Sequence, residues 1–323
     1  MKNTDFWKNF RLGEELSVSG AFIYNGLRRF HELKKLDHTD DLFEVFYNLS
    51  VGFERLLKIV VVLLEHKDSD DQNAFEESLI THSHQDLLRR IKKHTEVKFG
   101  TPHNDFLSLL AKFYKTIRYG RFSIQSVPDF HRERRELCAF LAKHLNVEFP
   151  ADPSPIGIFN DDAYRKFVRG IALKISSTLY EIVKARSREL NLYTYELRHG
   201  SKAETVFLAK ADIPAEDVLW KELLVFFMNT KETNGYLKFL RETPPLDFDP
   251  GDIGDYLDCF QADAAKSFVM DHLEHLYEEL PSKERSERLN RMSIIGAPNV
   301  DFSEDDSDEE PDDDFEFGSD PDE

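Results

Sequence analysis

Arg118, Tyr119 and Arg121 are the residues whose types best suit the binding of a phosphate group. A guanidinium group presents several N–H donors to phosphate oxygens, and two such groups stand here at the expected end of a helix. The alternative is structural: each arginine pairs with a carboxylate on a neighbouring helix or reaches from the end of a bundle into solvent. Both interpretations remain open from the sequence.

Further cations surround this group. Between His84 and Glu136 the chain has twelve lysines and arginines but only six acidic residues. This bias is typical of a surface that binds a polyanion, although a solvated helix face rich in lysine has the same composition. The segment therefore predicts a surface that binds nucleic acid or phosphate, made of Arg118, Tyr119, Arg121, Arg89, Arg90, Lys92 and Lys93.

An apolar helix from Asp41 to Glu65 is expected to position these residues. Its first half is apolar at helical spacing, and residues 59–64 are apolar on every face, which suits a helix enclosed by other helices. This run is far too short to cross a bilayer. An up-and-down helical bundle is predicted for residues 1–148, with further helices over residues 6–36, 85–94, 106–118 and 131–145.

The rest of the chain is expected to form a second helical domain, residues 156–294, so that the fold is mainly α. Three prolines in residues 149–155 mark the boundary. Within the second domain, the pattern of residues 191–208 around a Gly-Ser turn predicts one β-hairpin. Residues 297–323 have too few apolar side chains to bury a core and are expected to be a disordered acidic tail.

Charge and cysteine content narrow the class of protein. The net charge is −19, but residues 301–323 hold 14 of the 61 acidic residues and no lysine or arginine, which leaves 42 basic and 47 acidic residues elsewhere. Cys138 and Cys259 lack the spacing of a metal or redox site and are expected to be free thiols. No signal sequence or membrane-spanning run is present. We therefore expect a cytoplasmic protein that does not bind a membrane.

Three segments, in order, resemble the HEPN superfamily, helical domains associated with nucleotide-binding and RNA-targeting proteins. Gly52–Lys58 is similar to the core helix of that family, in which an acidic residue and a lysine punctuate an apolar run. His84–Leu88 is similar to its short helix led by histidine, and Phe113–Tyr119 resembles the helix end that carries an Arg-Tyr pair. The resemblance covers about residues 40–122.

The resemblance implies a dimerising bundle that handles RNA or nucleotides in a bacterial defence, stress or toxin–antitoxin setting, with a nucleotidyltransferase or another protein as a partner. Catalytic members cut RNA without metal, using an arginine and a histidine four to six residues apart. The histidine would exchange protons with the ribose 2′-hydroxyl or the leaving oxygen, while the arginine holds the phosphate charge. No histidine follows Arg118 at that spacing, so the favoured function is RNA or nucleotide binding with weak catalysis or none.

Two rival functions follow from the same residues. The first is a metal-independent endoribonuclease whose histidine comes from elsewhere, with Arg118 and His84 as the catalytic pair and His94 or His131 as alternatives to His84. The second is an interaction protein that dimerises through its bundle and recruits a basic partner through its acidic tail, with Phe302, Phe315 and Phe317 as aromatic anchors. The tail could also cover residues 84–136 as a mimic of nucleic acid, or serve only solubility.

Motifs for other chemistries are incomplete. His82, His84, His94 and His103 do not have the spacing of metal ligands, so no metal site is expected. Gly200-Ser201 followed by Asp212 resembles a nucleotidyltransferase motif, but Pro214 stands where the second carboxylate should be. A P-loop, a dinucleotide-binding glycine motif and a nucleophile elbow are all missing, so no cofactor is predicted.

Overall fold

The computed structural model describes residues 3–127, 131–150, 157–199, 201–208, 213–231, 235–260 and 263–297. These residues are predominantly helical, which confirms the predicted mainly α fold. Within the described ranges no β-strand forms, and the β-type pairing is an isolated antiparallel bridge between Lys35 and Phe159. The chain divides into two compact units, residues 1–219 and 220–323.

The first unit contains the helices that carry most of the predicted site residues. In chain order they are α1 (Asn3–Phe6), the π-helix η1 (Trp7–Arg11), α2 (Leu12–Glu32), α3 (Thr39–Glu65), α4 (Gln72–Ser78), α5 (His84–Ile91), α6 (Thr101–Lys112), the π-helix η2 (Phe113–Ile117), α7 (Arg118–Gly120), the 3-10 helix η3 (Ile124–Ser126), α8 (Arg132–Leu145), α9 (Asp162–Glu189), the 3-10 helix η4 (Tyr195–Leu197) and α10 (Lys202–Phe207).

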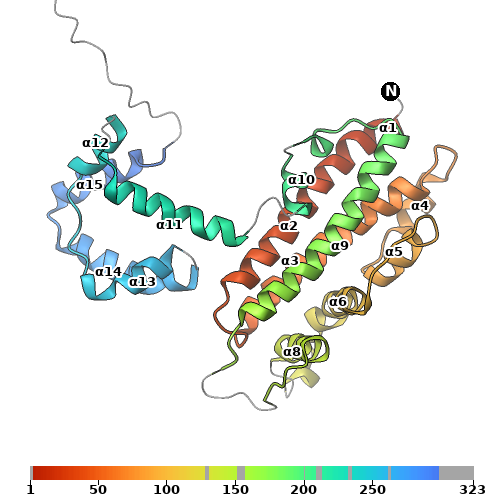
Figure 1. The fold of residues 1–323 in the computed structure, drawn as a ribbon, viewed down its shortest axis with the longest axis horizontal. Helices are drawn as coiled ribbons and strands as arrows, with labels where there is room; N and C mark the ends of the chain where they lie inside the picture. The colour runs from red at the N-terminus through yellow and green to blue at the C-terminus, as the bar shows by residue number, and fades with distance from the viewer. Residues whose placement is uncertain are drawn as a thin grey trace, which may run out of the picture. The chain divides into compact units, whose positions relative to one another are not determined.

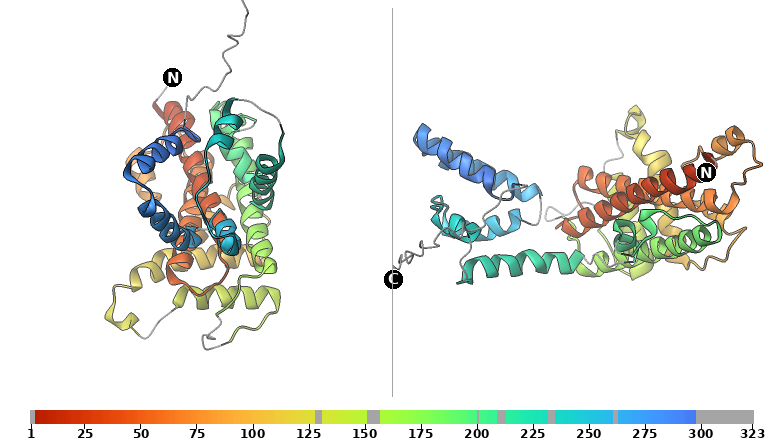
Figure 2. Two further views of the ribbon diagram at one scale, coloured as in Figure 1. Left: turned by 90° about the vertical axis from the view of Figure 1, so that its left-hand side faces the viewer. Right: turned by 90° about the horizontal axis from the view of Figure 1, so that it is seen from above.

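Helix α3 forms the centre of this unit, as its apolar sequence predicts. It begins at Thr39, two residues before the expected start, and ends at Glu65 as expected. It packs against α2, α5 and α9, while α6 and α8 lie side by side and cross these long helices (Figure 1, Figure 2). Because α3 has neighbours on several sides, it must be apolar around its circumference. Its completely buried side chains include Leu42, Phe53, Leu56, Leu57, Val60 and Val61.

Two glycines allow α2 and α3 to approach closely. A Cβ atom placed on Gly52 would lie 2.6 Å from Cγ1 of Ile23 and 3.1 Å from the carbonyl oxygen of Ser19. A Cβ atom on Gly26 would lie 2.7 Å from Cγ of Leu49. The hydroxyl of Ser19 donates a hydrogen bond to the carbonyl of Gly52 at 2.8 Å across the same contact. The crossing therefore depends on the missing side chains of both glycines.

Helix α9 belongs to the first unit, which differs from the domain boundary expected at residues 149–155. Its apolar face is buried against α3, including Ile171, Ile175 and Leu179. The segment before α9 is hydrogen-bonded to the loop between α2 and α3. The amide of Leu36 donates to the carbonyl of Ile158 at 2.8 Å. We call residues 33–37 and 157–160 the α2–α9 clip.

The predicted β-hairpin at residues 191–208 is wrong. Residues 195–197 form η4, and α10 follows from Lys202. The hydroxyl of Ser201 accepts a hydrogen bond from the amide of Glu204 at 3.1 Å, which caps the start of α10. Phe207 is completely buried, and α10 packs against α2 and α9. The helix cap and this tertiary contact prevail over the alternating pattern that suggested strands.

The second unit is also helical. After α11 (Ile213–Asn229), which begins in the first unit, come α12 (Gly235–Glu242), the 3-10 helix η5 (Pro250–Asp252), α13 (Ile253–Cys259), α14 (Asp263–Glu279) and α15 (Ser282–Ile294). Helices α13 and α14 pack together, and the ring of Trp220 stacks on that of Phe260 at 5.7 Å. Of the predicted acidic tail, residues 298–323 lie outside the described part of the chain.

No helix in the described ranges is long and apolar enough to cross a membrane.

The two cysteines are free thiols, as predicted, in different environments. Cys138 is buried in α8, and this burial raises the pKa of its thiol to about 11, whereas Cys259 is partly exposed. Because the thiolate is the reactive form, we expect iodoacetamide at pH 8 to alkylate Cys259 but not Cys138 in the native protein. Intact-mass and peptide mass spectrometry would measure this, with the protein in urea as the doubly modified control. Native alkylation at Cys138 would contradict the buried environment.

Candidate nucleic-acid interface

Arg118 is held among tyrosine rings and forms no ion pair with a carboxylate of the described residues. Its guanidinium carbon lies 3.9 Å from the ring centre of Tyr114, 4.4 Å from that of Tyr119 and 5.9 Å from that of Tyr47. One terminal nitrogen donates a hydrogen bond to the hydroxyl of Tyr119 at 2.6 Å. These cation–π contacts fix the guanidinium without neutralising it. The positive charge of Arg118 therefore remains for a ligand.

The helix that carries Arg118 changes its winding just before this residue. α6, η2 and α7 form one continuous helical run, and Phe113–Ile117 within it is wound as a π-helix. Phe113 and Ile117 are buried, whereas Tyr114 is half-buried. This arrangement anchors the apolar side of the helix in the core and leaves Tyr114 and Arg118 at its edge. Inserted π-turns of this kind are frequent at functional sites.

Glu54, Lys58 and His82 also lie close to Tyr114. The ring of His82 is 4.9 Å from the ring of Tyr114, edge to face. Its Nδ1 lies 3.0 Å from one carboxylate oxygen of Glu54, and the other oxygen accepts a hydrogen bond from Lys58 at 2.7 Å. We call Glu54, Lys58, His82, Tyr114 and Arg118 the Arg118 cluster. It joins two of the three segments that resemble HEPN proteins.

A groove runs beside the Arg118 cluster. It has a volume of about 320 Å³, and Glu54, Lys58 and Tyr114 form part of its lining. An ion pair between Arg55 and Glu15 forms another part of the wall. The floor is apolar, with contributions from Val51, Ile59, Val62 and Leu79. The groove thus combines an apolar floor with charged groups of both signs.

Exposed apolar side chains follow Arg118 along the chain. Tyr119 is 57% exposed, Phe122 91% and Ile124 87%. Lys115, one turn before Tyr119, is exposed as well. A flat aromatic ring that faces solvent beside a cation is the arrangement on which an unpaired base can stack. The sequence signalled Tyr119 at this site but not Phe122.

The other predicted phosphate-binding residues are divided between two places. Arg121 lies near the start of α3, where its guanidinium covers the ring of Phe43 at 4.9 Å and pairs with the buried Glu133 at 2.7 Å. Arg90 lies at the far end of α3, where it pairs with Glu65 at 2.5 Å. At 1.5 Å per residue, about 30 Å of helix separates these ends. One continuous basic face is therefore not formed.

The basic side chains near Arg90 differ in how far their charges are already paired. Arg89 makes an exposed ion pair with Asp86 at 2.7 Å, one turn away on α5. Arg90 donates to the carbonyl of Ser78 in addition to Glu65, so it connects α3, α4 and α5. Lys92 and Lys93 are exposed beyond the end of α5. Of these residues, the two lysines are the freest to contact a polyanion.

His84, the predicted catalytic histidine, is completely buried. Its Nε2 donates a hydrogen bond to the carbonyl of Ser50 at 2.9 Å, and its Nδ1 has no partner in the described structure. Burial lowers the pKa of its imidazole to about 4. A neutral ring without access to solvent does not suit proton exchange with RNA. In this structure His84 instead fastens the start of α5 to the middle of α3.

The other candidate histidines differ in their surroundings. His94 lies 3.5 Å from Glu65, near Arg90. His131 has a left-handed backbone conformation, with φ of 59°, and lines a pocket of about 260 Å³ together with Arg121. The Arg118 cluster instead contains His82, for which the sequence offers no signal over His84. Among the described residues, no group of three or more histidine, cysteine or acidic side chains is arranged to hold a metal ion.

Comparison of the chain with protein-family models, with curated proteins and with solved structures finds no match to any of them.

Proposed function

We propose that this protein binds single-stranded RNA through the Arg118 cluster and the exposed residues that follow it, without cleaving the RNA efficiently. The proposal keeps the HEPN-like character and the defence or toxin–antitoxin setting that the sequence resemblance implies. The observation that carries it is the guanidinium of Arg118, held by the rings of Tyr47, Tyr114 and Tyr119. Tyr119 is exposed, and the exposed ring of Phe122 follows three residues later in the chain.

Each part of this surface has a counterpart in a single strand of RNA. Bases can stack on Tyr119 and Phe122, because every base has a flat π face. Arg118 and Lys115 can pair with the phosphates between the bases. The buried, neutral state of His84 supports binding in preference to catalysis, because it removes the proton-transfer group that the sequence suggested.

The expected result of Tyr119→Ala is a loss of RNA affinity of about tenfold, because stacking on an aromatic ring contributes roughly 1–3 kcal/mol per base. Arg118→Glu should weaken binding at least as much. Fluorescence anisotropy with a labelled twelve-nucleotide RNA, in EDTA and at two salt concentrations, would measure both effects.

Lys174→Glu is the matched control, because Lys174 is an exposed cation on α9. It lies near His103 at the start of α6, whereas Arg118 is at the other end of the same helical run. The control variant should bind RNA as the unmodified protein does. The proposal would be contradicted if Tyr119→Ala and Arg118→Glu bound RNA as tightly as Lys174→Glu does. It would also be contradicted if none of the proteins, including the unmodified one, bound RNA. Thermal unfolding of each variant shows that the comparison is between folded proteins.

A second candidate function, a metal-independent endoribonuclease, is favoured by His82. An ionised carboxylate only accepts hydrogen bonds, so contact with Glu54 places the proton of His82 on Nδ1 and leaves Nε2 for a substrate. The side chain of His82 is 48% exposed. Cleavage of the labelled RNA in EDTA, lost in His82→Ala and retained in His84→Gln, would establish this function instead of simple binding.

A further inference from the structure

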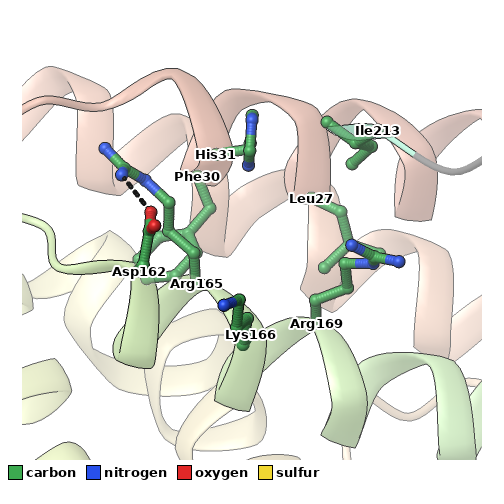
Figure 3. A pocket seen from close by; sticks show the side chains of 8 residues that line it. All are labelled: Leu27, Phe30, His31, Asp162, Arg165, Lys166, Arg169 and Ile213. Carbon is green, nitrogen blue, oxygen red and sulfur yellow. Dashed lines mark hydrogen bonds and ion pairs between the residues drawn. The ribbon is translucent and has the colours of Figure 1, made fainter. Parts of the chain in front are cut away.

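A second pocket of the first unit has no part in the proposed RNA surface. It lies between the last turns of α2 and the start of α9, and has a volume of about 190 Å³. Leu27, Phe30 and Ile213 supply its apolar lining. Figure 3 shows the side chains of Leu27 and Phe30 between the two helices and that of Ile213 on the segment that passes beside α2. The apolar part therefore has the size for one aromatic ring or a short aliphatic chain, since a cavity of about 150 Å³ accepts benzene.

The charged side chains around this pocket are mostly basic. Arg165, Lys166, Arg169 and His31 line it, with Asp162 as the acidic member (Figure 3). Arg165 pairs with Asp162 at 3.0 Å and donates to the carbonyl of Leu33, so its charge is engaged. His31 and Arg169 make other interactions as well. Lys166 is exposed and has no ion pair with any described residue.

We infer that this pocket binds a carboxylate joined to an apolar body of about one ring, with the body on Leu27, Phe30 and Ile213 and the carboxylate at Lys166. The lining carries more cations than acids, so an anion is favoured over a neutral or cationic ligand of the same shape. When the apolar body binds, its own surface and the apolar lining of the pocket are both removed from water. This burial supplies most of the affinity.

A ligand with a carboxylate and an apolar body could be one of two kinds of molecule. One is a free small acid, for which 3-phenylpropionate is a suitable probe. The other is a peptide in which phenylalanine stands among acidic residues, as in residues 312–317 of this chain, with the sequence DDDFEF. A synthetic peptide with the sequence of residues 311–323 is the probe for the second source. The two arms of the experiment distinguish the sources.

The experiment measures binding of both probes to the full-length protein by isothermal titration calorimetry and by ligand-observed NMR. At least one probe is expected to bind. 3-Phenylpropanamide, which has the same body without the charge, and acetate, which lacks the body, should each bind at least about tenfold more weakly than 3-phenylpropionate. A peptide with both phenylalanines replaced by alanine should lose binding in the second arm.

Variants on one helix separate a role in this pocket from a general effect of charge. Lys166→Glu should weaken binding by about five- to tenfold, as expected for reversal of one exposed ionic contact. Lys174→Glu makes the same change of charge elsewhere on α9 and should leave the affinity unchanged. Failure of both probes to bind, or equal affinity for Lys166→Glu and Lys174→Glu, would overturn the inference. RNA binding by the Arg118 cluster is measured separately, so the two proposals fail independently.

Discussion

Gly52→Ala is expected to lower the free energy of unfolding of the first unit by about 2 kcal/mol, although alanine is the better helix former. The added Cβ atom would lie 2.6 Å from a carbon of Ile23 and close to the backbone of α2. The two central helices would have to separate, which disturbs the apolar contacts along both of them. Urea denaturation monitored by circular dichroism would measure the change.

The same substitution at Gly170 is the matched control. Gly170 lies in the interior of α9, and a Cβ atom placed there meets no atom within 4 Å. Gly170→Ala should therefore stabilise the protein by about 0.5–1 kcal/mol, because alanine restricts the unfolded chain and favours helix. Equal effects of the two substitutions would mean that the close contact between α2 and α3 is not formed in solution.

Acid is expected to destabilise the protein through His84. Its imidazole has a pKa of about 4 in the folded state, because it is buried, against an ordinary value of 6.5. Between these values the unfolded chain binds a proton that the folded protein does not. The stability contributed by neutral His84 is therefore complete above about pH 6.5 and is lost as the pH falls towards 4. The expected loss at pH 5 is about 2 kcal/mol, from 1.36 kcal/mol per pKa unit.

His84→Gln isolates this effect from the protonation of carboxylates and other histidines. Glutamine retains an N–H donor that can reach the carbonyl of Ser50, but it does not titrate. We expect the stability advantage of the unmodified protein over this variant to shrink by about 2 kcal/mol between pH 7.5 and pH 5. Urea denaturation of both proteins at several pH values provides the measurement. A difference independent of pH would show that His84 is accessible to solvent.

The sequence predicts the elements of this fold better than the contacts between them. Apolar periodicity located α3 to within two residues, because an enclosed helix must be apolar all around. This periodicity assigns no role to Gly26 or Gly52. Their importance comes from the contact between two helices, and periodicity along one helix does not contain that information.

The failure of the predicted hairpin has a local cause. Ser201 and Glu204 have the spacing of a helix cap, and this local signal favours a helix directly after the alternating residues 191–198. The hydroxyl of Tyr180 on α9 also donates to the carbonyl of Glu196 at 3.1 Å, which holds η4 against the bundle. Strand propensity depends on a partner strand, and the described structure provides none here.

In the candidate site, too, the sequence predicts residue types better than the contacts that they make. The sequence identified Arg118 and Tyr119 through residue type and position, and the structure places them together with Tyr114. For the histidine, the sequence favours His84, whereas His82, two residues earlier, is the one that the structure places in the Arg118 cluster. Ser83 caps α5 between them, so His84 begins the helix facing the core and His82 stays in the preceding loop beside Glu54. A shift of two positions thus separates a buried ring from an exposed one.

The α2–α9 clip sets the order in which the first unit can be completed during synthesis. It joins residues 33–37 to residues 157–160, so more than 120 residues must leave the ribosome before its hydrogen bonds can form. At about 5–20 residues per second this interval is on the order of 10 s. Throughout it the apolar face of α3 that α9 later covers stays open to solvent. Contacts so distant in sequence also raise the contact order and slow refolding of the finished chain.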